Sequence, residues 1–163
     1  MKLTCIQNYT QLANFIAELN RQKQYHIGYC GENVQEIEQT LRTDFSCEAF
    51  ILAINEQEIV GAIGLDLDEI GNGAEVWGPF IKTNEGTEQI LEVMWQELLK
   101  YHTDIKHFSF FINEENVIGQ YFMQMIGANC TGNHQILHLK KENFQVDSLM
   151  NSTLFNNHYF KAF

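Results

Sequence analysis

Carboxylates at alternate positions followed by a glycine are a pattern of calcium-binding loops, and one such run occurs here. Asp66 and Asp68 are followed by Gly71. A calcium loop also needs oxygen ligands at its fifth and twelfth positions. Those positions hold Ile70 and Trp77, so the sequence predicts no calcium site.

Two other groups of reactive side chains lack the partners that their chemistry needs. His134 and His138 have a spacing that joins metal ligands on a helix, but on an extended strand they would lie about 13 Å apart. Cys30 lies in a glycine-flanked loop, and no His-Asp pattern accompanies it as a nucleophile would require. We therefore interpret all three as ordinary strand, turn and loop residues and predict no metal site.

The local feature with the clearest structural consequence is Gly78-Pro79, within the apolar run of residues 74–81. Proline has no N–H to donate to a strand ladder, so Gly-Pro inside a buried strand predicts a bulge or a lost pairing. We expect this strand to splay from its neighbour at that point. A bulge that serves no ligand remains the alternative.

Length and charge limit the kind of protein that carries these residues. The chain has 163 residues, of which 45% are hydrophobic, and this is enough for one domain with its own core. It contains 10 Lys and Arg against 21 Asp and Glu, a net charge of −11. Such a surface repels nucleic acid and anionic lipid, and it attracts cationic small molecules or basic peptides.

The first five residues contain no charged segment leading into an apolar run, the pattern of a signal peptide, and no run approaches the roughly 18 apolar residues of a membrane span. We therefore expect a cytoplasmic protein without a membrane partner. Its four cysteines form no C-x-x-C pair, which predicts reduced thiols. They are Cys5, Cys30, Cys47 and Cys130.

Hydrophobic periodicity predicts the element order β-α-α-β-β-β-α-β-α-β. Expected strands cover residues 3–7, 49–54, 59–68, 74–81, 107–112 and 135–139. Expected helices follow the apolar stripes of residues 12–19, 34–45, 90–99 and 118–126. Asn113 and Asn116 precede the last helix as caps, and Gly127 ends it.

This element order resembles the GNAT superfamily of N-acetyltransferases over residues 3–139. The strand A-E-V-W-G-P-F-I, the Gly86 loop before a helix, and N-x-x-G-x-x-F-x-x-x-x-G from Asn116 to Gly127 add to the resemblance. It implies an α/β (α+β) fold: a mixed, mostly antiparallel sheet of six to seven strands with helices on both faces. The domain would span residues 1–145, followed by a tail of residues 146–163. A degenerate first half of a tandem member is an alternative.

The resemblance implies that acetyl-CoA is a co-substrate, with its pyrophosphate on the amides of a helix N-terminus. The residues that it assigns to the coenzyme are Phe80, Ile81, Lys82, Asn84, Gly86, Thr87, Asn113, Asn116 and Gly119. Two features depart from the family's phosphate loop, R/Q-x-x-G-x-G/A. Only Gly86 is kept, and the carboxylate of Glu88, which replaces a small residue, would repel a pyrophosphate.

Direct acetyl transfer to an amine needs a base, because an amine with a pKa of about 10 is protonated at pH 7. The resemblance implies that this base is Glu75, since several family members carry a catalytic carboxylate ahead of the kink in this strand. A solvent-facing strand glutamate without a catalytic role remains the alternative.

The thioester oxygen and the leaving thiolate also need partners. The family uses a strand N–H near the bulge, and because Pro79 has none, Gly78 or Phe80 would supply it. The family's tyrosine acid is replaced by Met123, which cannot donate a proton. Tyr121 is two helical residues away, about 200° around the axis, and is expected to point elsewhere.

We therefore expect an acetyl-CoA-dependent N-acetyltransferase that acts by direct transfer on a primary amine, either a cationic small molecule or a peptide. The alternative is a catalytically silent GNAT-like domain that binds a ligand or a protein partner. The tail of residues 151–163 is rich in apolar side chains that need a cover. That cover would be the domain itself, a second copy in a homodimer, or a second GNAT domain.

Overall fold

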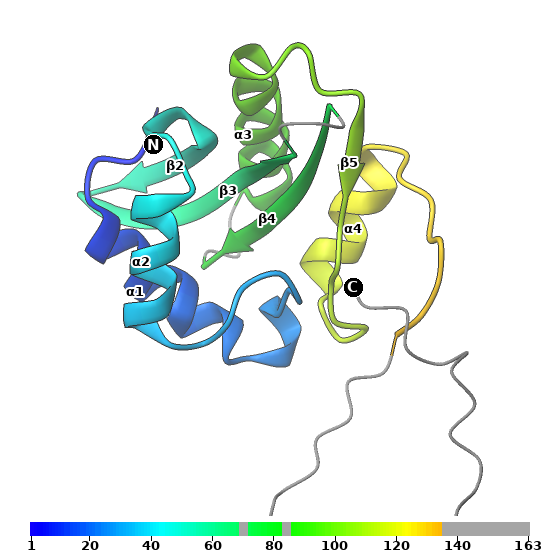
Figure 1. The fold of residues 1–163 in the computed structure, drawn as a ribbon, viewed down its shortest axis with the longest axis horizontal. Coiled ribbons are helices and arrows are strands. Elements are labelled where there is room, and N and C mark those ends of the chain that lie inside the picture. The colour runs from blue at the N-terminus through cyan, green and yellow to red at the C-terminus, as the bar shows by residue number, and fades with distance from the viewer. Residues whose placement is uncertain (69–71, 83–85, 135–163) are drawn as a thin grey trace, which may run out of the picture. The chain divides into compact units, whose positions relative to one another are not determined.

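A computed structural model describes residues 1–68, 72–82 and 86–134, and its compact unit extends from Met1 to Asn129 (Figure 1). The strands are β1 (Lys2–Thr4), β2 (Phe50–Asn55), β3 (Glu58–Asp68), β4 (Gly73–Ile81) and β5 (His107–Ser109). The α-helices are α1 (Tyr9–Asn20), α2 (Val34–Thr43), α3 (Thr87–Tyr101) and α4 (Val117–Met125). Two short 3₁₀ helices are η1 (Lys23–Tyr25) and η2 (Cys47–Ala49).

The five described strands form one sheet in the order β1-β2-β3-β4-β5. Neighbouring strands are antiparallel except β4 and β5, which are parallel and joined through α3. The predicted order of elements is confirmed as far as α4, together with the mixed, mostly antiparallel sheet. The expected last strand, residues 135–139, and the tail from residue 146 lie outside the described residues.

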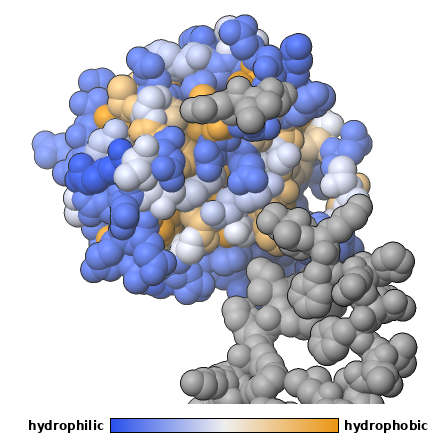
Figure 2. All heavy atoms as spheres, viewed as in Figure 1, coloured by the Kyte–Doolittle hydropathy of each residue, from blue (hydrophilic) through white to orange (hydrophobic). Residues whose placement is uncertain are grey.

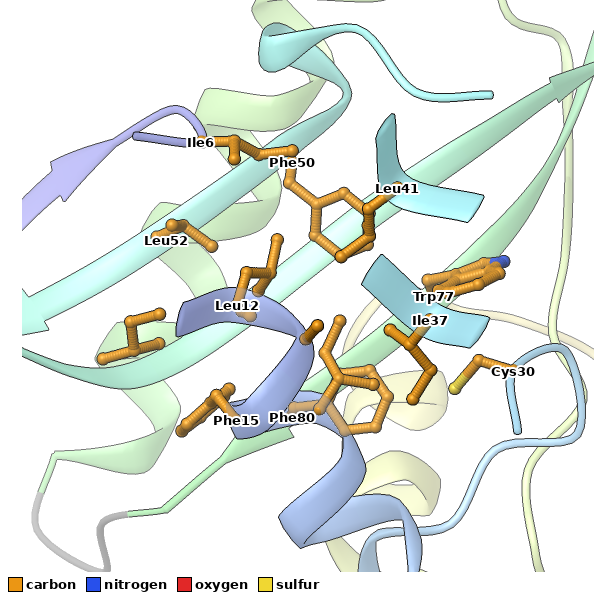
Figure 3. Packing of buried hydrophobic residues seen from close by; sticks show 14 of the residues in the cluster. Ile6, Leu12, Phe15, Cys30, Ile37, Leu41, Phe50, Leu52, Trp77 and Phe80 are labelled. Carbon is orange, nitrogen blue, oxygen red and sulfur yellow. The ribbon is translucent and has the colours of Figure 1, made fainter. Parts of the chain in front are cut away.

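The two faces of the sheet carry two separate hydrophobic clusters, because successive side chains along a strand point to opposite faces. On β2, Phe50 and Leu52 join the cluster formed with α1 and α2, which Figure 3 shows from close by. Ile51 and Ala53 join the cluster formed with α3 and α4. The prediction of helices on both faces is therefore confirmed.

Asparagine side chains fix where the helices begin. Asn8 accepts a hydrogen bond from the backbone N–H of Gln11 at the start of α1, at 3.0 Å. Asn33 accepts one from Gln35 at the start of α2, at 2.9 Å. These side chains satisfy N–H groups that the first helical turn leaves without partners.

Figure 2 shows the molecule from the side seen in Figure 1; hydrophilic residues dominate the coloured surface and hydrophobic ones are scattered between them. No helix within residues 1–68, 72–82 and 86–134 is long and apolar enough to cross a membrane.

Candidate functional site

The predicted splay between β4 and β5 is present, and it begins before Gly78-Pro79. The last parallel pair joins Glu75 to Ser109. β4 then continues to Ile81, and β3 is its one strand partner over this stretch in the described part of the chain. The free edge of β4 therefore begins directly after Glu75.

A competing set of backbone hydrogen bonds explains why β5 ends early. The N–H of Gly28 donates to the carbonyl of Phe111 at 2.6 Å, and the N–H of Asn113 donates to the carbonyl of His26 at 3.0 Å. The chain after β5 therefore pairs with residues 26–28, between α1 and α2. The expected strand of residues 107–112 is thus wrong in its second half.

Gly78-Pro79 forms a bulge on the side of β4 that faces β3. The strand register shifts between Ala62 and Gly64, so β4 has one residue more than β3 at this point. Gly78 has a φ of 114°, and a Cβ there would lie 2.9 Å from the carbonyl oxygen of Ala62. Only glycine adopts this conformation without strain.

Three residues at the end of β4 were assigned to the coenzyme from the sequence. Phe80 and Ile81 are 0% and 1% exposed, and their side chains pack in opposite faces of the sheet. Any ligand contact by these two would use their backbone groups. The Lys82 ammonium makes an exposed ion pair with Glu18 at 2.7 Å.

Glu75 lies directly opposite Asp66 on β3, so both carboxylates project from the same face of the sheet. Partial burial, followed by the charge of Asp66, raises the pKa of the Glu75 carboxyl. Partial burial, followed by the charge of Asp44, raises the pKa of Asp66. A carboxylate whose pKa is raised is a stronger proton acceptor, as a general base for an ammonium ion requires.

Tyr29 is a site residue that the sequence did not reveal. Burial and the charge of Glu75 raise the pKa of its hydroxyl, against a smaller opposite effect of a hydrogen bond with Ser109. Its ring packs edge-on against Phe111, with centroids 6.0 Å apart. Tyr29 therefore lies beside the last β4–β5 pair as a neutral hydroxyl.

The sequence feature next to Tyr29 that marks a close contact is the preceding glycine, Gly28. A Cβ on Gly28 would lie 2.0 Å from the ring of Phe111, so only glycine allows the loop to approach the segment after β5 this closely. The contact partner is far away in sequence, and no local pattern identifies it.

Asn20, at the end of α1, fixes the loop that carries Tyr29. It is fully buried, and its Nδ2 donates to the carbonyls of Cys30 and Gly31 at 2.8 and 3.1 Å. Its Oδ1 accepts from the N–H of Ile27 at 2.7 Å. Buried polar groups arranged in this way hold one loop conformation.

Asn116 secures the same loop from the other side. It is 0% exposed, its Oδ1 accepts from the N–H of Gly119 at 2.8 Å, and its Nδ2 donates to the carbonyl of His26 at 3.2 Å. A Cβ on Gly119 would lie 3.0 Å from Asn116, so the two pack tightly at the start of α4. The side chain of Asn113 accepts from the N–H of Glu115 at 2.9 Å. These three sequence-assigned residues therefore support the loop and the α4 N-terminus, and their predicted role toward a coenzyme stays a prediction.

The N-terminus of α3 offers backbone amides and a nearby negative charge. α3 begins at Thr87 after Gly86, and no side chain of a described residue caps its first turn. Such amides attract anions. Glu88 stands in the same turn and accepts a hydrogen bond from the Tyr121 hydroxyl, which raises the pKa of Tyr121. Asn84 lies outside the described residues.

An open hollow of about 510 Å³ lies between α3 and α4. The carboxylates of Glu88 and Glu92 line it beside Tyr121, and the described residues around it include no lysine or arginine. Its electrostatic character therefore disfavours phosphate groups.

Two sequence interpretations can be placed in the structure. Tyr121 turns toward Glu88 on α3, whereas Met123 packs against the hydrophobic cluster beneath α3 and α4. All four cysteines are unpaired, and burial raises the pKa of the Cys30 thiol to about 12. A thiol held protonated is a poor nucleophile, in agreement with its interpretation as a loop residue.

The mixed sheet, its helices and the parting of β4 from β5 define the class of fold. No protein-family model and no curated protein matches the chain by sequence. Solved structures do match, and they are GNAT-family acetyltransferases. At the identities found, the likeness shows that this chain has the GNAT fold.

Three neighbours illustrate that likeness. A GNAT acetyltransferase from Staphylococcus aureus has a TM-score of 0.59 and 17% identity, over 77% of this chain and 82% of its own. A predicted acetyltransferase from Clostridium acetobutylicum, solved with acetyl-CoA, has a TM-score of 0.60 and 8% identity, over 84% and 96%. The aminoglycoside N-acetyltransferase AAC(6')-Iy, in complex with CoA, has a TM-score of 0.57 and 13% identity, over 86% and 94%.

Two further aminoglycoside 6'-N-acetyltransferases are longer than the region they share with this chain. The chain spans 57% of the enzyme from Enterococcus faecium and 58% of one complexed with coenzyme A.

Proposed function

We propose that this protein is an acetyl-CoA-dependent N-acetyltransferase that acts on a primary amine by direct transfer. The observation that carries the proposal is the position of Glu75. Its carboxylate, with a raised pKa, lies at the last residue before β4 parts from β5. The GNAT fold, shared with proteins solved with CoA or acetyl-CoA, supports the same function.

In the proposed reaction, acetyl-CoA supplies an activated acetyl group. Glu75 accepts a proton from the bound ammonium, so the freed nitrogen lone pair attacks the thioester carbonyl. A C–N bond forms and the C–S bond breaks. The thiolate leaves without a side-chain acid, because a thiol pKa of about 8.5 makes it an adequate leaving group, and it takes up, directly or through water, the second proton that the nitrogen loses as the amide forms. A backbone N–H near the bulge, from Gly78 or Phe80, would stabilise the charge on the carbonyl oxygen.

Backbone groups of the described residues, more than their side chains, are placed to bind the coenzyme. The free edge of β4 at Phe80 and Ile81 offers N–H and C=O groups along which an extended amide-containing arm can add like a strand. The first turn of α3, which follows Gly86, offers backbone amides at a helix N-terminus, where a phosphate is attracted. Lys82 stands between the two and would have to leave Glu18 to reach a phosphate.

We expect the acceptor to be cationic, because the chain has a net charge of −11 and two carboxylates flank the proposed site. Aminoglycoside acetyltransferases are among the structural neighbours, and an amino sugar is therefore one candidate acceptor.

The test is the pH dependence of turnover in the Glu75→Gln variant. Turnover is measured as thiol release from acetyl-CoA in the presence of each of a panel of primary amines. Removing a general base lowers turnover by roughly 10²-fold or more at neutral pH. The deficit should shrink at high pH, where the amine loses its proton unaided. Glu58→Gln, an exposed carboxylate at the far end of the neighbouring strand β3, is the matched control and should leave the profile unchanged. An unaltered profile in Glu75→Gln would remove Glu75 from this role.

A catalytically silent GNAT-like domain is the second candidate, and the charge at α3 favours it. Glu88 occupies the first turn where a phosphate would bind, and Met123 cannot act as an acid. Calorimetric titration with acetyl-CoA separates the two functions. The absence of heat at high coenzyme concentration would exclude the enzyme, whereas saturable heat together with thiol release in the presence of an amine would support it.

A further inference from the structure

The proposed base, Glu75, directly faces a second carboxylate, Asp66, on the neighbouring strand. Asp66 and Glu75 are directly opposite on antiparallel strands, a position in which Cβ atoms lie about 5 Å apart and like charges destabilise the pair. The charge of Asp44, at the end of α2, reaches Asp66. None of the four ion pairs of the described residues includes any of these three. We call Asp44, Asp66 and Glu75 the acidic shelf.

Trp77 adds an independent indication that a ligand binds at the shelf. It is two residues after Glu75 on β4, so its side chain lies on the same face of the sheet. The indole is 4% exposed, and its Nε1 is the one buried side-chain nitrogen or oxygen of the described residues without a hydrogen-bond partner. Figure 3 shows this nitrogen at the end of the ring turned away from Phe50 and Phe80.

An indole N–H left without a partner in a buried position costs about 1–3 kcal/mol. The rest of the ring is well packed, with the Phe45 centroid 5.0 Å away, so the aromatic cluster itself gives the N–H nothing to bond. The nitrogen is turned out of that cluster on the sheet face that carries the shelf. An acceptor atom of a bound molecule would remove the cost.

We propose that the acidic shelf binds an amine with two positive charges, and that the Trp77 N–H meets an acceptor atom between the two nitrogens. The proposal rests on the proposed function in one respect, since the nitrogen at Glu75 is the one to be acetylated. The second nitrogen pairs with Asp66, and Asp44 adds to the attraction.

This arrangement explains why two like charges are kept face to face. With a monoamine, one positive charge faces two or three carboxylates and leaves repulsion in place. A diamine with three carbons between its nitrogens has a separation comparable to that of the facing side chains, and it neutralises both. Linear polyamines and diamino sugars share this chemistry.

The test is equilibrium binding by calorimetry in the absence of acetyl-CoA, so that its outcome does not depend on turnover. The probes are 1-aminopropane, 1,3-diaminopropane and 1,3-diamino-2-propanol. We expect the diamine to bind roughly tenfold or more tightly than the monoamine. The hydroxyl of the third probe offers an acceptor to Trp77 and should add about two- to tenfold. A gain from the hydroxyl supports the Trp77 contact, and its absence would overturn the proposal.

Variants separate the effect of the acidic shelf from the effect of the protein's overall negative charge. Asp66→Asn should reduce the preference for diamine over monoamine to about twofold, whereas the control Glu58→Gln should keep it. Asp44→Asn, which changes an exposed side chain and should not disturb folding, is the second variant and should reduce the preference partially. Equal affinity for the first two probes, or equal losses in Asp66→Asn and Glu58→Gln, would overturn the proposal. Acetylation of monoamines and diamines at equal rates would overturn it while leaving the proposed function intact.

Discussion

The two sides of the candidate site are built by different means. On the proposed acceptor side, the features are side chains: Asn20 fixes the loop, and Tyr29, Asp66 and Glu75 gather where β4 and β5 part. On the proposed coenzyme side, the groups that would bind are backbone amides and carbonyls, and the one acidic side chain in the first turn of α3, Glu88, would oppose a phosphate.

The difference suggests which features follow from the fold and which belong to this chain. A strand edge and a helix N-terminus tolerate large changes in sequence, because every residue except proline carries the same backbone donor and acceptor. The fold itself is shared with structures of 8–17% identity. Carboxylates and hydroxyls are specific to the sequence, so the acceptor side can be altered one residue at a time.

The largest effect on stability is expected where the acceptor loop is held. Asn20→Ala would leave the Ile27 N–H and the Cys30 carbonyl buried without partners and would remove the bond to the more exposed Gly31 carbonyl, at a cost of about 3 kcal/mol. Urea unfolding measures the loss. The control is Asn14→Ala, an exposed residue with one bond to the carbonyl of Thr10, which should lose under about 1 kcal/mol. Similar losses would show that the loop does not depend on its buried anchor.

The next largest loss of stability is expected at the Gly78-Pro79 bulge of β4. Gly78→Ala places a Cβ 2.9 Å from the carbonyl of Ala62 at a φ of 114°, and should cost about 2 kcal/mol. Gly73→Ala is the matched control on the same strand, because the nearest atom to its Cβ is 3.8 Å away. The two variants are compared by chemical denaturation. Equal stability of the two would mean that the bulge tolerates a side chain.

A smaller effect is expected from Glu88→Gln on the coenzyme side. Removing a negative charge from the first turn of a helix should tighten acetyl-CoA binding about two- to fivefold, measured by calorimetry. Glu92→Gln, one turn further along α3, should change the affinity less, since the helix-terminus effect falls off within the first turn. An unchanged affinity in Glu88→Gln would show that the charge of Glu88 does not weaken acetyl-CoA binding.

The smallest effect is a pH dependence of stability. The folded protein holds the pKa of Asp66 above its ordinary value, so ionisation favours the unfolded chain once the pH rises above about 3.9. Asp66→Asn should therefore be more stable than the wild type at pH 7, by under about 1 kcal/mol because the group is partly exposed. At pH 3 the two should be close to equal. A variant that is less stable at pH 7 would reverse the sign that we assign to this carboxylate.

Local patterns predicted the elements well because they depend on neighbouring residues. The apolar stripe of α3, the capping asparagine Asn116 and the terminating Gly127 act within one or two helical turns, and each lies where it was expected. The sequence also located Gly78-Pro79 as a strand irregularity, because both residues impose their backbone effect locally.

The position of the splay could not be read from local patterns. β5 ends at Ser109 because Phe111 bonds to Gly28, a residue that lies before the whole sheet region β2–β4 in the sequence. The same contact brings Tyr29 to Glu75. The end of β5 and the position of Tyr29 both depend on whether the chain after Ser109 pairs with β4 or with residues 26–28.

Local patterns and composition were enough to predict the order and type of the elements as far as α4, the acidity of the chain and the strand that carries Glu75. Each follows from side-chain periodicity, charge count or the fixed geometry of glycine and proline. Three features required the folded structure: Asp66 faces Glu75, Tyr29 lies beside Glu75, and the Trp77 N–H has no hydrogen-bond partner among the described residues. The physical reason is that strand register and loop docking are settled by packing between distant segments, and this packing turns separate polar residues into one site.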